Sequence, residues 1–95
     1  PLLYQLSFFD KNKKYKVTYN GKGEILEEVE VLELKNLPRE IRDQMNSDTY
    51  LEWSFAAEHQ RIIFRKKKAL YRIYGAFKDE SVELIFDSKG HSIKP

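Results

Sequence analysis

The stretch "YNGKGE" at residues 19–24 places two glycines around a lysine, a combination found in loops that bind phosphate. Such a loop holds an anion when a helix follows at once, because the free amides and the helix dipole then point at the anion. Residues 24–34 instead alternate like a strand and carry five glutamates. Since asparagine and glycine tolerate the positive φ of tight turns, we interpret the stretch as a turn between two strands.

Other polar groupings resemble catalytic or metal sites only in their residue types. The segment "DSKGH" at residues 87–91 contains the residues of a hydrolase triad, but five consecutive residues cannot supply the triad's geometry, so we predict a polar turn. His59 and His91 lack a metal-binding spacing, and we expect both at the surface. Asp10 begins a segment like a calcium loop that lacks the sixth-position glycine and the closing acid.

These observations predict a protein that is not an enzyme and has no metal or cofactor. One enzymatic alternative is a base formed by the N-terminal amine of Pro1, which requires Pro1 to be the true mature N-terminus. The chain has no cysteine, which excludes disulfides and thiolate catalysis. No apolar run approaches the roughly 18 residues of a membrane span.

A basic stretch at residues 61–78 carries seven positive charges and no acid, with Tyr71, Tyr74 and Phe77 interleaved. Backbone charge combined with base stacking is how proteins bind single-stranded nucleic acid, which is therefore an alternative function. However, residues 24–33 carry a charge of −5, and the whole chain is nearly neutral at +2. We therefore expect the acidic segment to pair with the basic one inside the protein, and we do not expect nucleic acid as a partner.

The elements that position these residues show an internal repeat. Residues 3–26 align without a gap to residues 70–93, at an offset of 67. Leu6 aligns with Ile73 and Tyr19 with Phe86, whereas Phe8 against Gly75 is the clear mismatch. Apolar residues alternate within each copy, which predicts pairs of half-buried strands joined by short polar loops. We interpret the two copies as related strand-hairpin units in one domain of 95 residues.

A helix is predicted between the two units. Asn36 suits its N-cap and Pro38 its first turn, and Leu37, Ile41 and Met45 recur every four residues on one stripe. Residues 51–57 alternate again as a long strand, which we expect to continue toward residue 64. The predicted fold is α+β: an antiparallel sheet of about six strands with one α-helix packed on one face.

Three motifs follow one another along the chain: the tyrosine-rich strand and turn "YKVTYNGKG", the helix start "LKNLPREI" and the closing strand and turn "VELIFDSKG". In these motifs the chain resembles the PepSY-like proteins with the β-lactamase-inhibitor-like fold. It implies a secreted or periplasmic protein without enzymatic activity, whose role is binding. The family commonly pairs two such units, and here the first unit lacks a helix and long strand of its own. The resemblance brings no catalytic residues.

Together, these observations predict a non-enzymatic binding module of the cell envelope, periplasmic or extracellular, whose partner is a protein or peptide. We expect a monomer or a weak dimer. Aromatic and arginine side chains dominate binding hot spots, so we look for the contact surface on the sheet face that the helix leaves open. The candidate residues are Trp53, Arg72, Tyr74, Arg65, Lys66, Lys67 and Lys68. For Trp53 the alternative is a core position, which its alternation with Leu51 and Phe55 favours.

Overall fold

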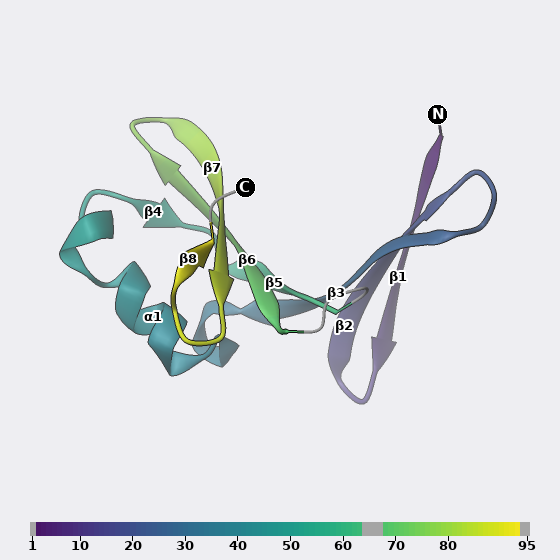
Figure 1. Ribbon diagram of the computed structural model, residues 1–95, viewed down its shortest axis with the longest axis horizontal. Coiled ribbons are helices and arrows are strands. Elements are labelled where there is room, and N and C mark those ends of the chain that lie inside the picture. The colour runs from purple at the N-terminus through teal and green to yellow at the C-terminus, as the bar shows by residue number, and fades with distance from the viewer. Residues whose placement is uncertain (1, 64–67, 94–95) are drawn as a thin grey trace.

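A computed structural model describes residues 2–63 and 68–93 of the chain. In these residues eight strands form one antiparallel sheet, in the order β1-β2-β3-β5-β6-β7-β8 with β4 beside β6 (Figure 1). The strands are β1 (Leu3–Asp10), β2 (Lys13–Asn20), β3 (Ile25–Glu33), β4 (Ser54–Phe55), β5 (Glu58–Ile62), β6 (Leu70–Phe77), β7 (Glu80–Asp87) and β8 (Ser92–Ile93).

One α-helix, α1 (Arg39–Met45), lies among the described residues, between two 3₁₀ turns at Leu34–Asn36 and Asp48–Tyr50. It is only seven residues long, because the chain does not become α-helical until after Pro38. Asn36, the predicted N-cap, belongs instead to the first 3₁₀ turn. None of the helices in the described ranges is long and apolar enough to cross a membrane.

The predicted α+β fold with six strands is therefore wrong, and the protein has a mainly-β fold. The predicted long strand at residues 51–57 is also broken. Trp53 N donates to Tyr50 O at 3.0 Å, which extends the turn, and only Ser54 and Phe55 pair with β6 as β4. The chain then shifts so that β5 lies between β3 and β6. Alternation alone did not reveal this interruption, because the apolar residues before and after it recur with the same period of two.

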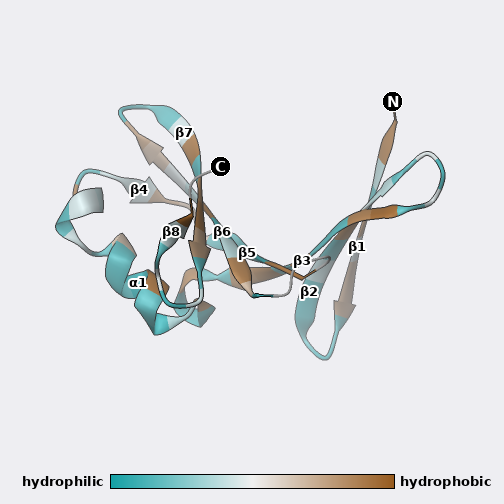
Figure 2. Ribbon diagram, viewed as in Figure 1, coloured by the Kyte–Doolittle hydropathy of each residue, from teal (hydrophilic) through white to brown (hydrophobic). Residues whose placement is uncertain are grey.

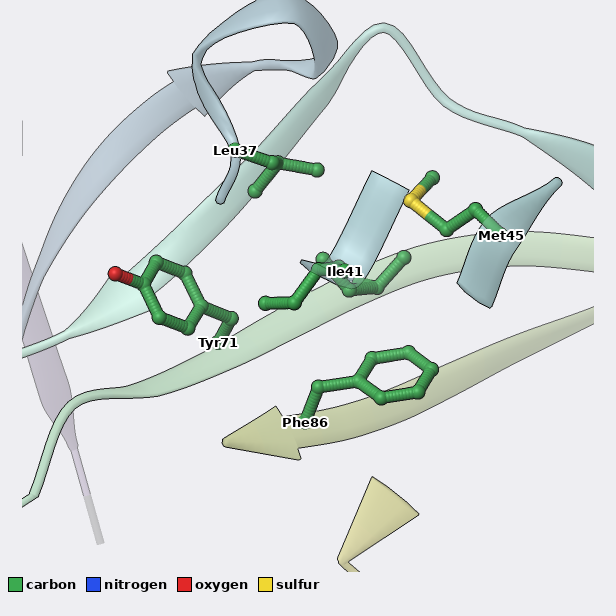
Figure 3. Packing of buried hydrophobic residues seen from close by; sticks show 6 residues of the cluster. Leu37, Ile41, Met45, Tyr71 and Phe86 are labelled. Carbon is green, nitrogen blue, oxygen red and sulfur yellow. The ribbon is translucent and has the colours of Figure 1, made fainter. Parts of the chain in front are cut away.

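The main hydrophobic core lies between α1 and the second half of the sheet. Leu37, Ile41 and Met45 are buried as predicted and pack against β6 and β7 (Figure 3). Only Ile41 and Met45 lie on α1, because Leu37 precedes the helix in extended backbone. Their partners on the sheet are Tyr71, Ile73 and Phe86. We call the sheet face that carries Tyr71 and Ile73 the helix-side face, and the opposite face the open face.

The two units repeat in structure down to the register. Strand β1 pairs with β2 from Leu3↔Asn20 to Asp10↔Lys13, and β6 pairs with β7 from Leu70↔Asp87 to Phe77↔Glu80, each residue being offset by 67. Both hairpins turn through two residues of positive φ, as type I′ turns require: 51° and 67° in the first, 50° and 66° in the second.

The following turns also coincide. The Asn20 Oδ1 accepts from the backbone amides of Lys22 at 2.9 Å and Glu24 at 3.0 Å, so "YNGKGE" is a turn, as predicted. Asp87 Oδ1 does the same for the amides of Lys89 and His91, at 3.0 and 2.9 Å. These hydrogen bonds, led by the one from His91, lower the pKa of Asp87. The carboxylate thus organises a turn.

His59 is fully buried, so its predicted surface position is wrong. Its Nδ1 accepts a hydrogen bond from the backbone amide of Tyr74 at 3.0 Å, and its Nε2 has no hydrogen-bond partner among the described residues. This arrangement requires the neutral imidazole with the proton on Nε2. The sequence does not show this burial, because His59 becomes an inner residue only when β5 pairs with β3 on one side and β6 on the other.

Acid should destabilise the protein through His59. Burial lowers its pKa below the ordinary 6.5, and the backbone of Ala56 opposes this only in part. The unfolded chain therefore binds the proton more readily. The contribution of His59 to the free energy of unfolding should be fully present above about pH 6.5. It should be lost as the pH falls from there through the lower pKa of His59 in the folded chain. Urea unfolding at several pH values measures this slope, which His59→Gln should flatten and the exposed control His91→Gln should retain.

Candidate functional site

The predicted contact residues do not form one surface. Arg72 and Tyr74 lie on the open face of β6, whereas Trp53 lies on the helix-side face. Lys68 is exposed just before β6. Arg65, Lys66 and Lys67 lie outside the described residues.

Trp53 belongs to an aromatic cluster beside the core. Its ring stacks on Phe77 at a centroid distance of 5.6 Å and meets Tyr50 edge-on at 5.2 Å. Gly75 makes this possible, since a Cβ there would lie 3.2 Å from Trp53 Cε3 and 3.1 Å from Phe55 Cδ1. Trp53 is half-buried. It therefore contributes packing to the second unit.

Arg72 is held by an ion pair inside the protein. Its Nη1 and Nη2 donate to the two carboxylate oxygens of Glu27 at 3.0 and 2.7 Å, and Nη1 also donates to Gln60 Oε1 at 2.7 Å. Glu27 raises the pKa of Arg72, chiefly through these hydrogen bonds. The arginine links β6, β5 and β3 on the open face.

Arg61 makes the matching link on the helix-side face. Its Nη2 and Nε donate to Glu30 Oε1 at 2.7 and 3.0 Å, and Lys13 Nζ lies 3.9 Å from Glu30 Oε2. These residues line a groove of about 970 Å³ between the β1–β2 turn and the start of α1. The predicted pairing of the acidic and basic segments is thus confirmed for Glu27 and Glu30, whose partners among the described basic residues are Arg72 and Arg61.

Replacing Glu30 should destabilise the protein more than replacing an exposed glutamate. The Glu30 side chain is 6% exposed. Glu30→Gln removes the negative charge that strengthens the hydrogen bonds from Arg61, and at this buried position water cannot compensate for the loss. We expect a loss of about 1–3 kcal/mol in the free energy of unfolding. The control is Glu33→Gln, which breaks an exposed pair with Lys35 and should cost less than about 1 kcal/mol. Equal losses in urea unfolding would contradict the burial of the Glu30 pair.

An uncovered apolar face lies on the first unit. Residues paired across neighbouring strands have their side chains on the same face of a sheet. Successive pairs connect Tyr71 to Arg61, Glu30, Tyr15 and finally Phe8, so Phe8 lies on the helix-side face. The residues of β1 and β2 that share this face are Tyr4, Leu6, Phe8, Tyr15, Val17 and Tyr19, which we call the first apolar face. Figure 2 shows apolar residues along β1, at the end of the sheet away from α1.

The first apolar face is partly open to solvent. Tyr4 and Leu6 are 54% and 53% exposed, and Phe8 is 39% exposed while it stacks on Tyr15 at 5.4 Å. Only Val17, in the middle of the face, is buried. Sequence reasoning missed this surface, although the repeat contained the signal: two units share one apolar pattern and a single helix lies between them.

The described residues contain no group of three or more histidine and acidic side chains placed to hold a metal ion. The contact between His91 Nδ1 and Asp87 Oδ2, at 3.1 Å, belongs to the exposed turn after β7. Neither a scan of protein-family models nor a search of curated proteins finds a match to this chain. The resemblance to PepSY-like proteins therefore stays a prediction.

Proposed function

We propose that this chain is a non-enzymatic protein-binding module of the cell envelope, and that its first apolar face contacts a protein or peptide partner. The exposed Tyr4, Leu6 and Phe8 on one face of one strand carry the proposal. Contiguous exposed apolar side chains of this kind are typical of interaction surfaces, and aromatic residues supply much of the binding energy there. Localisation outside the cytoplasm is supported by the family resemblance alone, and cell fractionation tests it.

The strand itself favours recognition of a polypeptide. Among the described residues β1 ends the sheet, so one row of its backbone amides and carbonyls faces away from β2. An added strand can bind such an edge through main-chain hydrogen bonds while its side chains contact the neighbouring face. An apolar face next to an available edge suits an extended or partly extended chain segment.

Selection from a displayed library of peptides of roughly 20 residues tests this function directly. Leu6 and Leu3 lie on the two faces of β1 and are 53% and 62% exposed, so Leu6→Glu and Leu3→Glu introduce the same charge with little effect on folding. We expect selected peptides to bind the natural chain and Leu3→Glu alike, and to bind Leu6→Glu at least about tenfold more weakly.

Two outcomes would contradict the proposed function. One is selected peptides that bind Leu6→Glu as tightly as the natural chain, which would place the contact elsewhere. The other is tight binding of single-stranded RNA or DNA that falls steeply between ~50 and ~200 mM salt and is lost when Lys66–Lys68 are changed to alanine. That result would make the chain a nucleic-acid-binding module.

A further inference from the structure

We infer that the first apolar face binds an acidic segment of a partner protein, folded as an amphipathic helix followed by a strand. The helix would occupy the position that α1 holds on the second unit, and the strand would pair with β1. This inference rests on the proposed function and specifies its ligand. It follows from comparing two surfaces of the same molecule, one covered and one open.

The covered surface identifies the helix. Tyr71, Ile73 and Phe86 on the second unit contact the stripe of Leu37, Ile41 and Met45. At the same register positions the first unit presents Tyr4, Leu6 and Tyr19. The two surfaces thus have similar side chains on equivalent backbone, so the first should accept apolar residues at the same sequence spacing of i, i+4 and i+8, with the last two on a helix.

The glycine turns show the same relationship. A Cβ on Gly90 would lie 2.7 Å from the backbone oxygen of Glu40, so α1 rests directly on this turn. Gly23 has the equivalent positive φ, 81° against 84°, yet a Cβ there would meet no atom of the described residues within 4 Å. The first unit therefore retains a turn that admits a helix at close range, and the space beside it is open.

The sheet edge identifies the strand. β4 and β5 pair with the edge of β6 that faces away from β7. The corresponding edge of β1 is the end of the sheet. Phe55 lies opposite Gly75, but the first unit has Phe8 at that position. Because Phe8 fills the space that Trp53 and Phe55 use in the second unit, the partner strand must carry small side chains opposite it.

The charge of the first unit selects the partner. The first unit, residues 3–26, contains five lysines against two acidic residues, Asp10 and Glu24. A second copy of this chain would bring the same positive charge against it, which is unfavourable. An acidic segment of another protein would be attracted, so the polar side of the helix and strand should be rich in glutamate and aspartate.

A fusion protein tests the inference. Residues 34–62 have a net charge of −1, from four basic and five acidic residues. A second copy of them, carrying Trp53→Ala and Phe55→Ala, is joined ahead of residue 3 by a glycine–serine linker of about eight residues. The linker gives the copy a high effective concentration at the first apolar face. The matched control adds Ile41→Asp in the extra copy only.

Hydrogen exchange of the β1 amides gives the result. We expect exchange in β1 to slow at least about tenfold in the fusion protein and to return to the rate of the natural chain in the Ile41→Asp control. Exchange that is unchanged in the fusion protein, or slowed equally in the control, would overturn the inference. Peptides that depend on Leu6 would then still support the proposed function, so the two failures are distinguishable.

Analytical ultracentrifugation of the natural chain tests a second copy as the occupant. We expect a monomer with the first apolar face open. A dimer that Leu6→Glu dissociates and Leu3→Glu leaves intact would overturn the inference, because a second copy would then cover this face. Among peptides that depend on Leu6, acidic sequences with apolar residues at i, i+4 and i+8 would support it, whereas basic or patternless sequences would count against it.

Discussion

Ile73→Ala should lower the free energy of unfolding by about 2–5 kcal/mol, whereas Leu6→Ala at the equivalent position should cost less than about 1 kcal/mol. Ile73 is fully buried beneath α1, so its truncation removes transfer energy and leaves a cavity. Leu6 is 53% exposed, so solvent can fill the space that its side chain leaves. The pair compares covered and uncovered copies of one surface within one molecule.

Urea unfolding of both variants measures the difference. A small domain has only about 5–15 kcal/mol of stability, which the loss at Ile73→Ala can exhaust. Ile73→Val provides a milder change with an expected cost of about 0.5–1.5 kcal/mol. Similar losses for Ile73→Ala and Leu6→Ala would show that the first unit is covered in solution as the second one is. That result would contradict the exposed state of the first apolar face.

Gly90→Ala should destabilise the protein by about 2–5 kcal/mol, and Gly23→Ala by only about 1–2 kcal/mol. Both glycines have positive φ, so alanine is strained at each. The difference comes from α1: a Cβ at position 90 would lie 2.7 Å from the Glu40 oxygen and 3.1 Å from its carbonyl carbon. Backbone cannot move aside as a long side chain can, so the helix or the turn must shift.

Thermal and urea unfolding of the two variants give the comparison directly. A near-equal effect of Gly90→Ala and Gly23→Ala would mean that α1 does not rest on the turn. The fusion protein offers a further check, because an added helix on the first unit should make Gly23→Ala more costly than it is in the natural chain. The two glycines therefore report helix docking on each unit separately.

Local chemistry predicted much of the structure. The turn at Asn20–Gly23, the helix stripe through Ile41 and the pairing of acidic with basic segments are consequences of residue type and spacing, and each is present. The fold class was wrong because the short helix and the division of β4 from β5 depend on contacts between distant strands.

The candidate site was less predictable for a related reason. Leu6 and Ile73 stand in the same alternating pattern, so periodicity assigns both to an apolar face and cannot tell which face the single helix covers. Arg72 and Trp53 were chosen because such residues are frequent in binding surfaces. Arg72 instead forms an ion pair with Glu27, which is 45 residues away in the chain. Trp53 packs in an aromatic cluster with Phe77, which is 24 residues away.

The matched type I′ turns also have a consequence for the order of folding. Each hairpin closes over two residues, so β1–β2 and β6–β7 need only local contacts, and hairpins of this kind form in about 1–10 μs. Joining the two units requires β3 to meet β5, where Glu30 and Arg61 are 31 residues apart in the chain. Loop closure of that length costs more entropy than either hairpin. We therefore expect the transition state for folding to contain both hairpins, with their joining through β3 and β5 as the slow step.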